Sequence, residues 1–269
     1  MAVSSVFWLR VAVCFYAVGL LHSMLVLMKG SDALYALARG AFRIGATLQA
    51  VSIVELGMAQ GRIPVGGDVL QTMNLCAFLI AALFLAVEWK YHFATTAVAH
   101  FPLVFVMTLL VAAAQRPATA PGDVRVKGTW LAIHIVLILA GYASLALTAA
   151  ASICYLIQER RLKNKKPVRF LEKLPPLATL DNLISGSLGM AFVLITLGVV
   201  LVILWEVLYS TAPWIGDPRV MVSLITWALL VAATYLRATA GWRGRRVAVM
   251  ALVVLGASIV TWSAWGSVS

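Results

Sequence analysis

The sequence predicts an all-α fold, a polytopic transmembrane helical bundle of about eight spanning helices. Hydrophobic residues make up 62% of the 269 residues and charged residues only 12%, which is typical of an integral membrane protein. The apolar stretches reach the roughly 20 residues that a helix needs to cross a bilayer core. They do not alternate as barrel strands do, and helices satisfy their own backbone polar groups in lipid. We therefore expect a single membrane domain over 1–269.

The apolar stretches define the expected helices in chain order. The spans are 6–28, 36–59, 68–88, 94–114, 129–157, 180–210, 219–237 and 245–265. The first is longer than the apolar region of a signal peptide and lacks a clear cleavage site, so we expect it to remain a span. Arg39 and Arg43 interrupt the first turns of the second. The fifth and sixth are long enough to tilt or to project beyond the bilayer.

The connections between these spans are irregular or basic. Residues 115–128, QRPATAPGDVRVKG, are rich in Pro and Gly and read as a surface segment. Residues 158–182 mix basic and apolar side chains, and we expect a membrane-surface turn that ends at Pro175-Pro176. No span is broken midway by paired Gly and Pro, so the discontinuous-helix pattern of many secondary transporters is missing. A transporter is accordingly the third hypothesis for function.

The positive charge predicts the orientation. Lys and Arg are about three times as frequent in the odd-numbered connections as in the even-numbered ones, which places the odd-numbered connections in the cytoplasm. Both termini are then on the outer, periplasmic side of a bacterial inner membrane. The net charge of +11 follows from this topology and from contact with anionic lipid, so no nucleic-acid partner is expected.

His134 is the polar residue within the spans that points most directly to a function. An ionisable side chain in lipid costs roughly 2.5–3.5 kcal/mol on insertion scales, so each one is a candidate site. His134 lies about five residues into the fifth span, shallow on the outer side. A neutral imidazole there is a suitable iron ligand, and a histidine hydrogen-bonded across helices is the alternative. We expect His22 and His100 to be packing residues, and Glu55 to reach the interface or to pair with Arg62.

Tryptophans gather near the outer ends of the spans. An aromatic belt at the membrane interface accounts for most of them, namely Trp130, Trp205, Trp262 and Trp265. Trp214 differs because it belongs to a short connection with Asp217-Pro218. This corner, WIGDPRVMVSLITW (214–227), favours a binding surface over a plain connector.

This corner resembles the tryptophan-rich signature of the cytochrome c assembly proteins, the CcsA and CcmC haem-handling group. In that family a W-x-W-D-P corner precedes an apolar run that ends in L-I-T-W. Trp214, Asp217 and Leu224–Trp227 have the matching spacing. The stretches 130–166, 180–205 and GWRGRR (241–246) are similar to other parts of the family, so the resemblance covers a CcsA-like core over 129–266.

The resemblance implies a bundle that presents haem, expected to be haem b, at its outer face under the 205–227 loop. His134 then matches an axial ligand of the haem iron, and Trp214 and Asp217 match the haem-contacting loop, with Trp205 and Trp227 at its two ends. A tryptophan can cover a porphyrin face, and Asp-Pro stiffens the turn that holds it.

Several family residues are replaced in this chain. The tryptophan before the aspartate is Gly216, and the earlier tryptophan of the loop falls on Thr211. Gln49 and Tyr235 stand where two further histidines are expected, and 260–269 holds no counterpart of the last one. The chain therefore looks closest to the shorter HemX-like and YpjD-like branch.

Two functions of different classes remain. The first is a haem-binding protein that assists cytochrome c biogenesis with other maturation membrane proteins and apocytochrome c, an assembly factor and not a turnover enzyme. The second is a HemX-like regulator or scaffold of tetrapyrrole metabolism without bound haem, which uses the basic connection 158–173 to contact a cytoplasmic partner.

Overall fold

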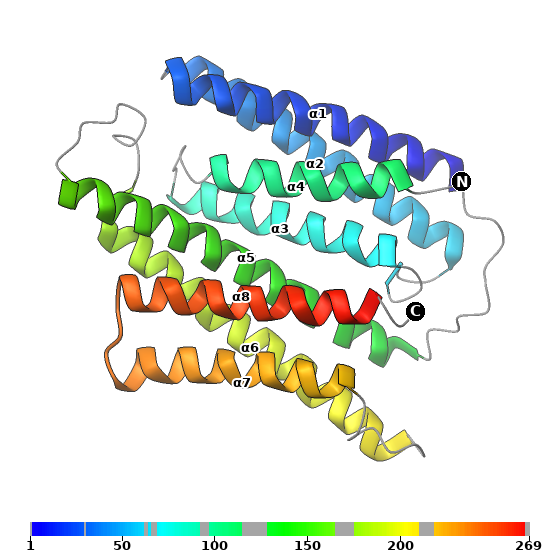
Figure 1. Cartoon of the computed structure of the whole chain (residues 1–269). Helices are drawn as coiled ribbons and strands as arrows, with labels where there is room; N and C mark the ends of the chain where they lie inside the picture. Colours follow the sequence, from blue (N-terminus) through cyan, green and yellow to red (C-terminus); the bar gives the residue numbers. More distant parts are fainter. Residues whose placement is uncertain are drawn as a thin grey trace. The chain divides into compact units, whose positions relative to one another are not determined.

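The structure, a computed structural model, describes residues 2–29, 31–61, 64–65, 69–91, 97–114, 128–164, 175–209 and 218–266. Over these residues it contains helices and no strand (Figure 1). The helices are α1 Ala2–Lys29, α2 Asp32–Gln60, α3 Val69–Tyr91, α4 Ala97–Ala114, α5 Gly128–Asn164, α6 Leu177–Tyr209, α7 Pro218–Thr239 and α8 Arg245–Gly266. Each expected span falls on one of them, and the clearest difference is α5, which continues to Asn164. The all-α helical prediction is confirmed.

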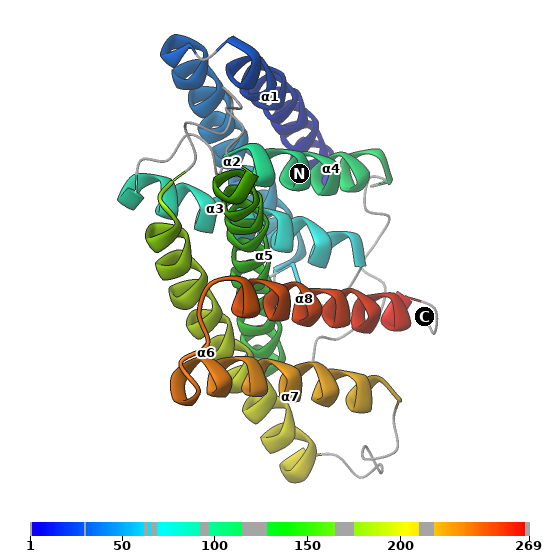
Figure 2. The same ribbon diagram turned by 60° about the vertical axis from the view of Figure 1, so that its left-hand side comes forward.

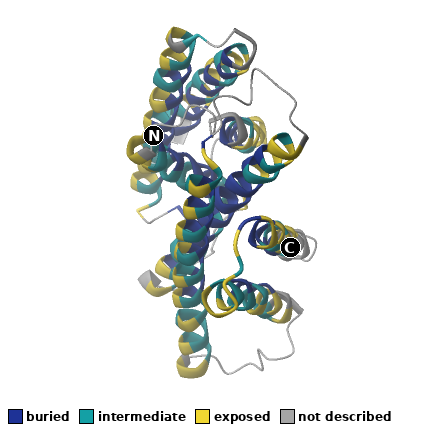
Figure 3. Cartoon of the chain, turned by 90° about the vertical axis from the view of Figure 1, so that its left-hand side faces the viewer, coloured by how far each residue is buried: buried dark blue, intermediate teal, exposed yellow. Residues whose placement is uncertain are grey.

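Four of the described helices, α1, α3, α5 and α6, are long and apolar enough to cross a bilayer. Shorter apolar stretches lie in α4 and α7, at His100–Ala114 and Ser223–Thr239. Large apolar side chains are exposed along one face of α6, at Val193, Leu197 and Val200, and Figure 3 shows such exposed positions along the helices. Exposed apolar faces are typical of contact with lipid, so the chain is a multi-pass membrane protein. The spanning role of α2 and α8 and the outer position of both termini stay predictions.

The helices group into two compact units, α1–α4 and α5–α8. Whether these make the single domain expected over 1–269 stays a prediction. In the first unit, α1 packs on α2 and α4, and α3 packs on α4 and α2. Its buried centre is aromatic: the rings of Phe42 and Phe101 stack with centroids 4.2 Å apart, and His100 stacks on Phe84 at 5.0 Å. His100 is thus a packing residue of this centre, as its sequence position suggested.

A polar network around Gln49 joins all four helices of the first unit. The Gln49 side chain is fully buried. Its Oε1 accepts a hydrogen bond from the Tyr16 hydroxyl at 2.7 Å, and its Nε2 donates to Asn74 Oδ1 at 2.8 Å and to Thr108 Oγ1 at 3.4 Å. Buried polar groups are stable only with such partners. Gln49 therefore holds α1, α3 and α4 against α2.

The arginines of α2 are compensated by a buried carboxylate on α3. Glu88 is 3% exposed and accepts a hydrogen bond from the Tyr35 hydroxyl at 2.9 Å. Its oxygens lie 3.6 Å from Arg39 Nε and 3.9 Å from an Arg43 terminal nitrogen. Opposite charges at one end of neighbouring helices offset the penalty of placing each near lipid. From the sequence, the two arginines contributed only to the count of positive charges that predicts orientation. Glu88 was not identified as their partner.

In the second unit, α5 and α6 form a long pair, α8 packs on α5, and α7 packs on α8 (Figures 1 and 2). Two glycines allow the close approach of α5 and α6. A β-carbon on Gly141 would lie 2.4 Å from Ile195 Cγ1, and one on Gly198 would lie 2.6 Å from Ile138 Cδ1. Small residues of this kind let helix backbones approach in a membrane. Further along the pair, the Thr148 hydroxyl donates to Ser187 Oγ at 2.8 Å.

We expect Gly141→Ala to lower the free energy of unfolding by about 1–2 kcal/mol, because overpacking against Ile195 outweighs the better helix propensity of alanine. Gly189→Ala on α6 is the matched control, since a β-carbon there meets nothing within 4 Å. That variant is expected to be neutral or up to about 1 kcal/mol more stable. Thermal unfolding of the two variants in detergent measures the difference, and equal shifts would contradict the packing argument.

Candidate functional site

His134 lies near the start of α5 and is oriented by a backbone carbonyl of α6. Its Nδ1 lies 2.8 Å from the carbonyl oxygen of Gly198. A carbonyl can only accept, so Nδ1 carries the hydrogen, and Nε2 of the neutral ring keeps its lone pair. Metal-ligating histidines are oriented in this way, with the second ring nitrogen donating to a carbonyl or carboxylate. The side chain is half-buried and has the tautomer of an iron ligand.

The close approach of α5 and α6 makes this hydrogen bond possible. Ile138 and Gly141 follow His134 at helical spacing. Ile138 packs against Gly198 of α6, and Gly141 packs against Ile195 of α6. The same face of α5 begins with Trp130, whose indole N–H donates to the carbonyl oxygen of Leu201 at 3.0 Å. Trp130 and His134 are four residues apart, as are neighbours along one helix face. The α5 face that carries His134 is therefore held to α6 at two carbonyls.

Trp227 contacts α6 from the side of α7. Its indole N–H donates to Thr196 Oγ1 at 3.1 Å. Thr196 and Gly198 are two residues apart, so they face different sides of α6. The structure thus ties His134 and Trp227 to the same part of α6, on separate faces of that helix.

The remaining predicted site residues are only partly covered by the structure. Trp205 lies half-buried near the end of α6, one turn beyond Leu201. Trp214 and Asp217 lie outside the described residues. The set His134, Trp205, Trp214, Asp217 and Trp227 therefore stays a prediction as a haem-contacting site.

Two positions where the resemblance implies histidines have other roles. The Gln49 side chain is hydrogen-bonded to Tyr16 and Asn74 in the first unit, and Tyr235 is 63% exposed on α7.

The other polar residues that the sequence singled out have local partners. The His22 ring lies 2.8 Å from the carbonyl oxygen of Val18 in its own helix. Glu55 accepts a hydrogen bond from the Trp8 indole at 3.1 Å, a contact that the sequence did not suggest, while Arg62, the partner that the sequence suggested, lies outside the described residues. No group of three or more His, Cys, Asp and Glu side chains suited to a metal ion occurs in the described part of the chain.

A charged clamp at the opposite end of the second unit was missed by sequence reasoning. Both Arg237 terminal nitrogens bond to the Asp181 carboxylate, at 3.1 and 3.3 Å. The Gly244 N–H donates to Asp181 Oδ1 at 3.0 Å, in a turn where Gly241 and Gly244 both have φ near +60°. The clamp joins the start of α6 to the end of α7 and to the turn before α8. The sequence did offer a signal for this pair. Asp181 is a lone aspartate in an apolar span, and Arg237 lies at the end of the next span, on the same side of the membrane.

The sequence profile of a family described as "Cytochrome C assembly protein" matches residues 67–267. The match begins before the core expected over 129–266 and so includes α3 and α4. It contains His134 and the 214–227 corner.

Individual relatives agree with this profile. "Cytochrome c biogenesis protein CcsA" of Thermosynechococcus vestitus (strain NIES-2133 / IAM M-273 / BP-1) is 26% identical over 211 residues, which cover 61% of this chain and 66% of that protein. The CcsA of Guillardia theta is 29% identical over 147 residues, 49% of each chain. This chain thus spans between about half and two thirds of the length of these curated relatives.

A solved structure, "Cytochrome c Heme Lyase CcmF", has a similar fold. The TM-score is 0.70 at 15% identity, over 97% of this chain and 46% of that one. At this identity the likeness concerns the fold alone.

Proposed function

Because the chain belongs to the cytochrome C assembly protein family, we propose that it is a haem-handling membrane protein of cytochrome c biogenesis, with His134 as one axial ligand of the haem iron. The observation that carries the proposal is the hydrogen bond from His134 Nδ1 to the Gly198 carbonyl. With the hydrogen on Nδ1, the lone pair of Nε2 can bind iron, and the hydrogen bond raises the basicity of the ring. This geometry supports the proposal that His134 would bind the haem iron through Nε2.

The rest of the proposed site comes from the loop between α6 and α7. Trp205 and Trp227 are placed by α6 and α7, and Trp214 and Asp217 would lie in the connection between these helices. Their indole rings would contact the porphyrin, and Asp217 with Pro218 would stiffen the turn. The placement of haem, of b type, under the 205–227 loop at the outer face is part of the same proposal.

In this proposal haem is cargo that the chain holds and presents. Thioether formation needs paired cysteines, and the three cysteines here, Cys14, Cys76 and Cys154, are free thiols on three different helices. The cysteines would come from apocytochrome c, with other maturation membrane proteins as partners. The chain would therefore act as an assembly factor.

We expect the purified wild-type protein in detergent to show a Soret band, with or without added haem, and His134→Ala to lose it. The matched control is His22→Ala, because that imidazole bonds only to its own helix. Added imidazole should restore part of the band in His134→Ala by occupying the vacated ligand position. A wild-type protein that stays colourless with added haem, or a band that survives in His134→Ala, would contradict the proposal.

A regulator or scaffold without haem is the second candidate, and the Gln49 network favours it. At this position of α2 the side chain is fully used by Tyr16, Asn74 and Thr108, so it offers no iron ligand. A colourless protein whose cytoplasmic partner is lost when Lys163, Lys165 and Lys166 are neutralised would support this alternative.

A further inference from the structure

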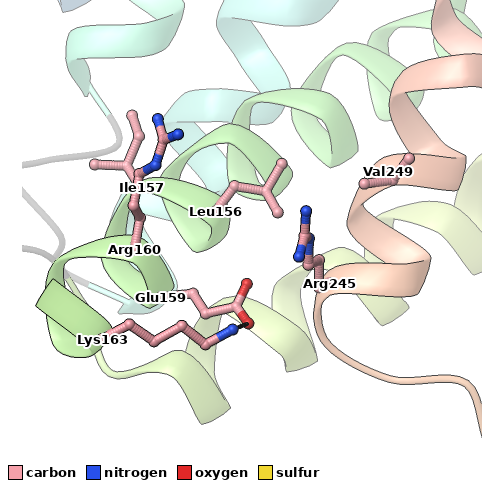
Figure 4. Close-up of a pocket in the computed structure, with 7 residues that line it drawn as sticks. All are labelled: Leu156, Ile157, Glu159, Arg160, Lys163, Arg245 and Val249. Carbon is pink, nitrogen blue, oxygen red and sulfur yellow. Dashed lines mark hydrogen bonds and ion pairs between the residues drawn. The ribbon is translucent and has the colours of Figure 1, made fainter.

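A cleft of about 600 Å³ lies between the end of α5 and the start of α8 (Figure 4). It is lined by Leu156, Ile157, Glu159, Arg160, Lys163, Arg245 and Val249. In Figure 4 the side chains of Leu156, Glu159 and Arg245 project into the space between the two helices. All seven residues belong to the second unit.

The cleft carries a net positive charge. Lys163 is paired with Glu159, Nζ to Oε1 at 2.7 Å. Among the described residues, Arg160 and Arg245 have no carboxylate within ion-pair distance. Both arginines line the cleft and are exposed. In Figure 4 the Arg245 guanidinium lies between the two helices, and the Arg160 guanidinium lies at the edge of the cleft beside Ile157. Guanidinium binds phosphate oxygens through its fork of N–H donors.

The apolar part of the cleft lies on one side of these charges. On α5 the apolar Leu156 and Ile157 precede the charged run that starts at Glu159, and on α8 Arg245 precedes Val249. Ile157 is 43% exposed and Val249 46% exposed. Charged residues at the helix ends with exposed apolar residues one turn deeper match an amphiphile, with its anionic group at the interface and its chains in the bilayer. A free phosphate ion would leave the apolar residues without a partner.

The backbone just before Arg245 is held in position before any ligand arrives. The preceding residue, Gly244, bonds through its N–H to Asp181 Oδ1. A β-carbon on Gly244 would lie 2.5 Å from the Tyr155 hydroxyl oxygen, so the turn sits directly against α5. The start of α8 is thereby fixed to α6 and α5, and less conformational freedom is lost on binding.

We propose that this cleft binds the phosphate headgroup of an anionic phospholipid through Arg160 and Arg245, with Leu156, Ile157 and Val249 against its acyl chains. The site is independent of haem: Glu159 lies 25 residues beyond His134 on α5, which is roughly 38 Å along a helix. The positive-inside prediction puts this end at the cytoplasmic leaflet, where anionic headgroups attract basic residues.

Native mass spectrometry of the full chain in detergent tests the proposal, with dioleoylphosphatidylglycerol and dioleoylphosphatidylcholine as probes. We expect the wild-type protein to retain phosphatidylglycerol in preference to phosphatidylcholine. Arg245→Gln should reduce that retention about fivefold, the effect of about one basic residue at an anionic surface. Arg243→Gln is the matched control, because Arg243 is an exposed arginine two residues away that does not line the cleft; retention should stay within about twofold.

Each of the following results would overturn the proposed lipid site. Equal retention of phosphatidylcholine would remove the headgroup selectivity. An equal loss in Arg243→Gln would show diffuse attraction to the basic turn instead of a cleft. Displacement of the lipid by millimolar inorganic phosphate would show an anion site without acyl-chain contact. Should Arg245→Gln unfold, Arg160→Gln on α5 makes the same comparison, and an unchanged retention there contradicts the proposal.

Discussion

Gln49→Leu is expected to lower the free energy of unfolding by about 3 kcal/mol. The substitution leaves the Tyr16 hydroxyl, Asn74 and Thr108 without their shared partner. An unsatisfied buried polar group costs about 1–3 kcal/mol, although hydrogen bonds between membrane helices are often weaker, at about 0.6 kcal/mol each. The loss extends to all four helices of the first unit because Gln49 contacts the other three. Unfolding in mixed detergent and dodecyl sulfate micelles measures it.

Thr47→Val is the matched control for this prediction. Thr47 is an exposed residue of α2 whose hydroxyl donates only to the Ile44 carbonyl of its own helix, at 2.8 Å. Its replacement should change stability by less than about 0.5 kcal/mol. Tyr16→Phe removes one bond of the network and should give an intermediate loss. If Gln49→Leu unfolds like the wild type, the network does not hold the first unit together.

Asp181→Ala is expected to lower the free energy of unfolding by a similar amount, about 3 kcal/mol. The substitution leaves Arg237 without a carboxylate and removes the acceptor for the Gly244 N–H. Removing one partner of a buried pair costs about 3–5 kcal/mol, and we expect the lower end because both side chains are 16% exposed. Asp181→Asn keeps an acceptor for Gly244 and should lose less, which separates the charge from the backbone contact. Thermal unfolding in detergent compares them.

The control for the clamp is Glu159→Ala. Glu159 forms an exposed ion pair with Lys163 one turn along the same helix, and such pairs contribute about 0.3–0.5 kcal/mol. A loss in Glu159→Ala as large as that in Asp181→Ala would mean that general charge balance, and not the clamp, stabilises this end of the second unit.

Part of the candidate site could be predicted from the sequence, because its signals are local. A histidine within an apolar span is conspicuous against a hydrophobic background. The tryptophans and the Asp-Pro pair of 214–227 lie close together along the chain. The tautomer of His134 could not be predicted, because it depends on the carbonyl of Gly198, 64 residues away. The same holds for the hydrogen bonds of Trp130, which was interpreted as a belt residue, and of Trp227, which the resemblance placed at one end of the loop, because both acceptors lie on α6.

The buried charges show the limit of that reasoning. Arg39 and Arg43 could be counted from the sequence as positive charges near one end of the second span, yet their partner Glu88 lies on another helix. Asp181 carried no prediction from the sequence, although Arg237 and Gly244 both bond to it. Charge content can be counted along a chain, whereas pairing depends on which helix ends meet.

The sequence by itself determined the order and the apolar centre of the helices that the structure describes, while the end of α5, at Asn164, lies beyond its apolar stretch. Lipid requires each segment to satisfy its own backbone and to be apolar over the bilayer thickness, and both are properties of a single continuous stretch. The tertiary structure alone decided that Gln49 is a structural centre, that His134 presents Nε2, and that Arg245 meets α5 in a cationic cleft. These depend on contacts between helices, and the physical reason is that a polar side chain takes its role from the partner that packing places beside it.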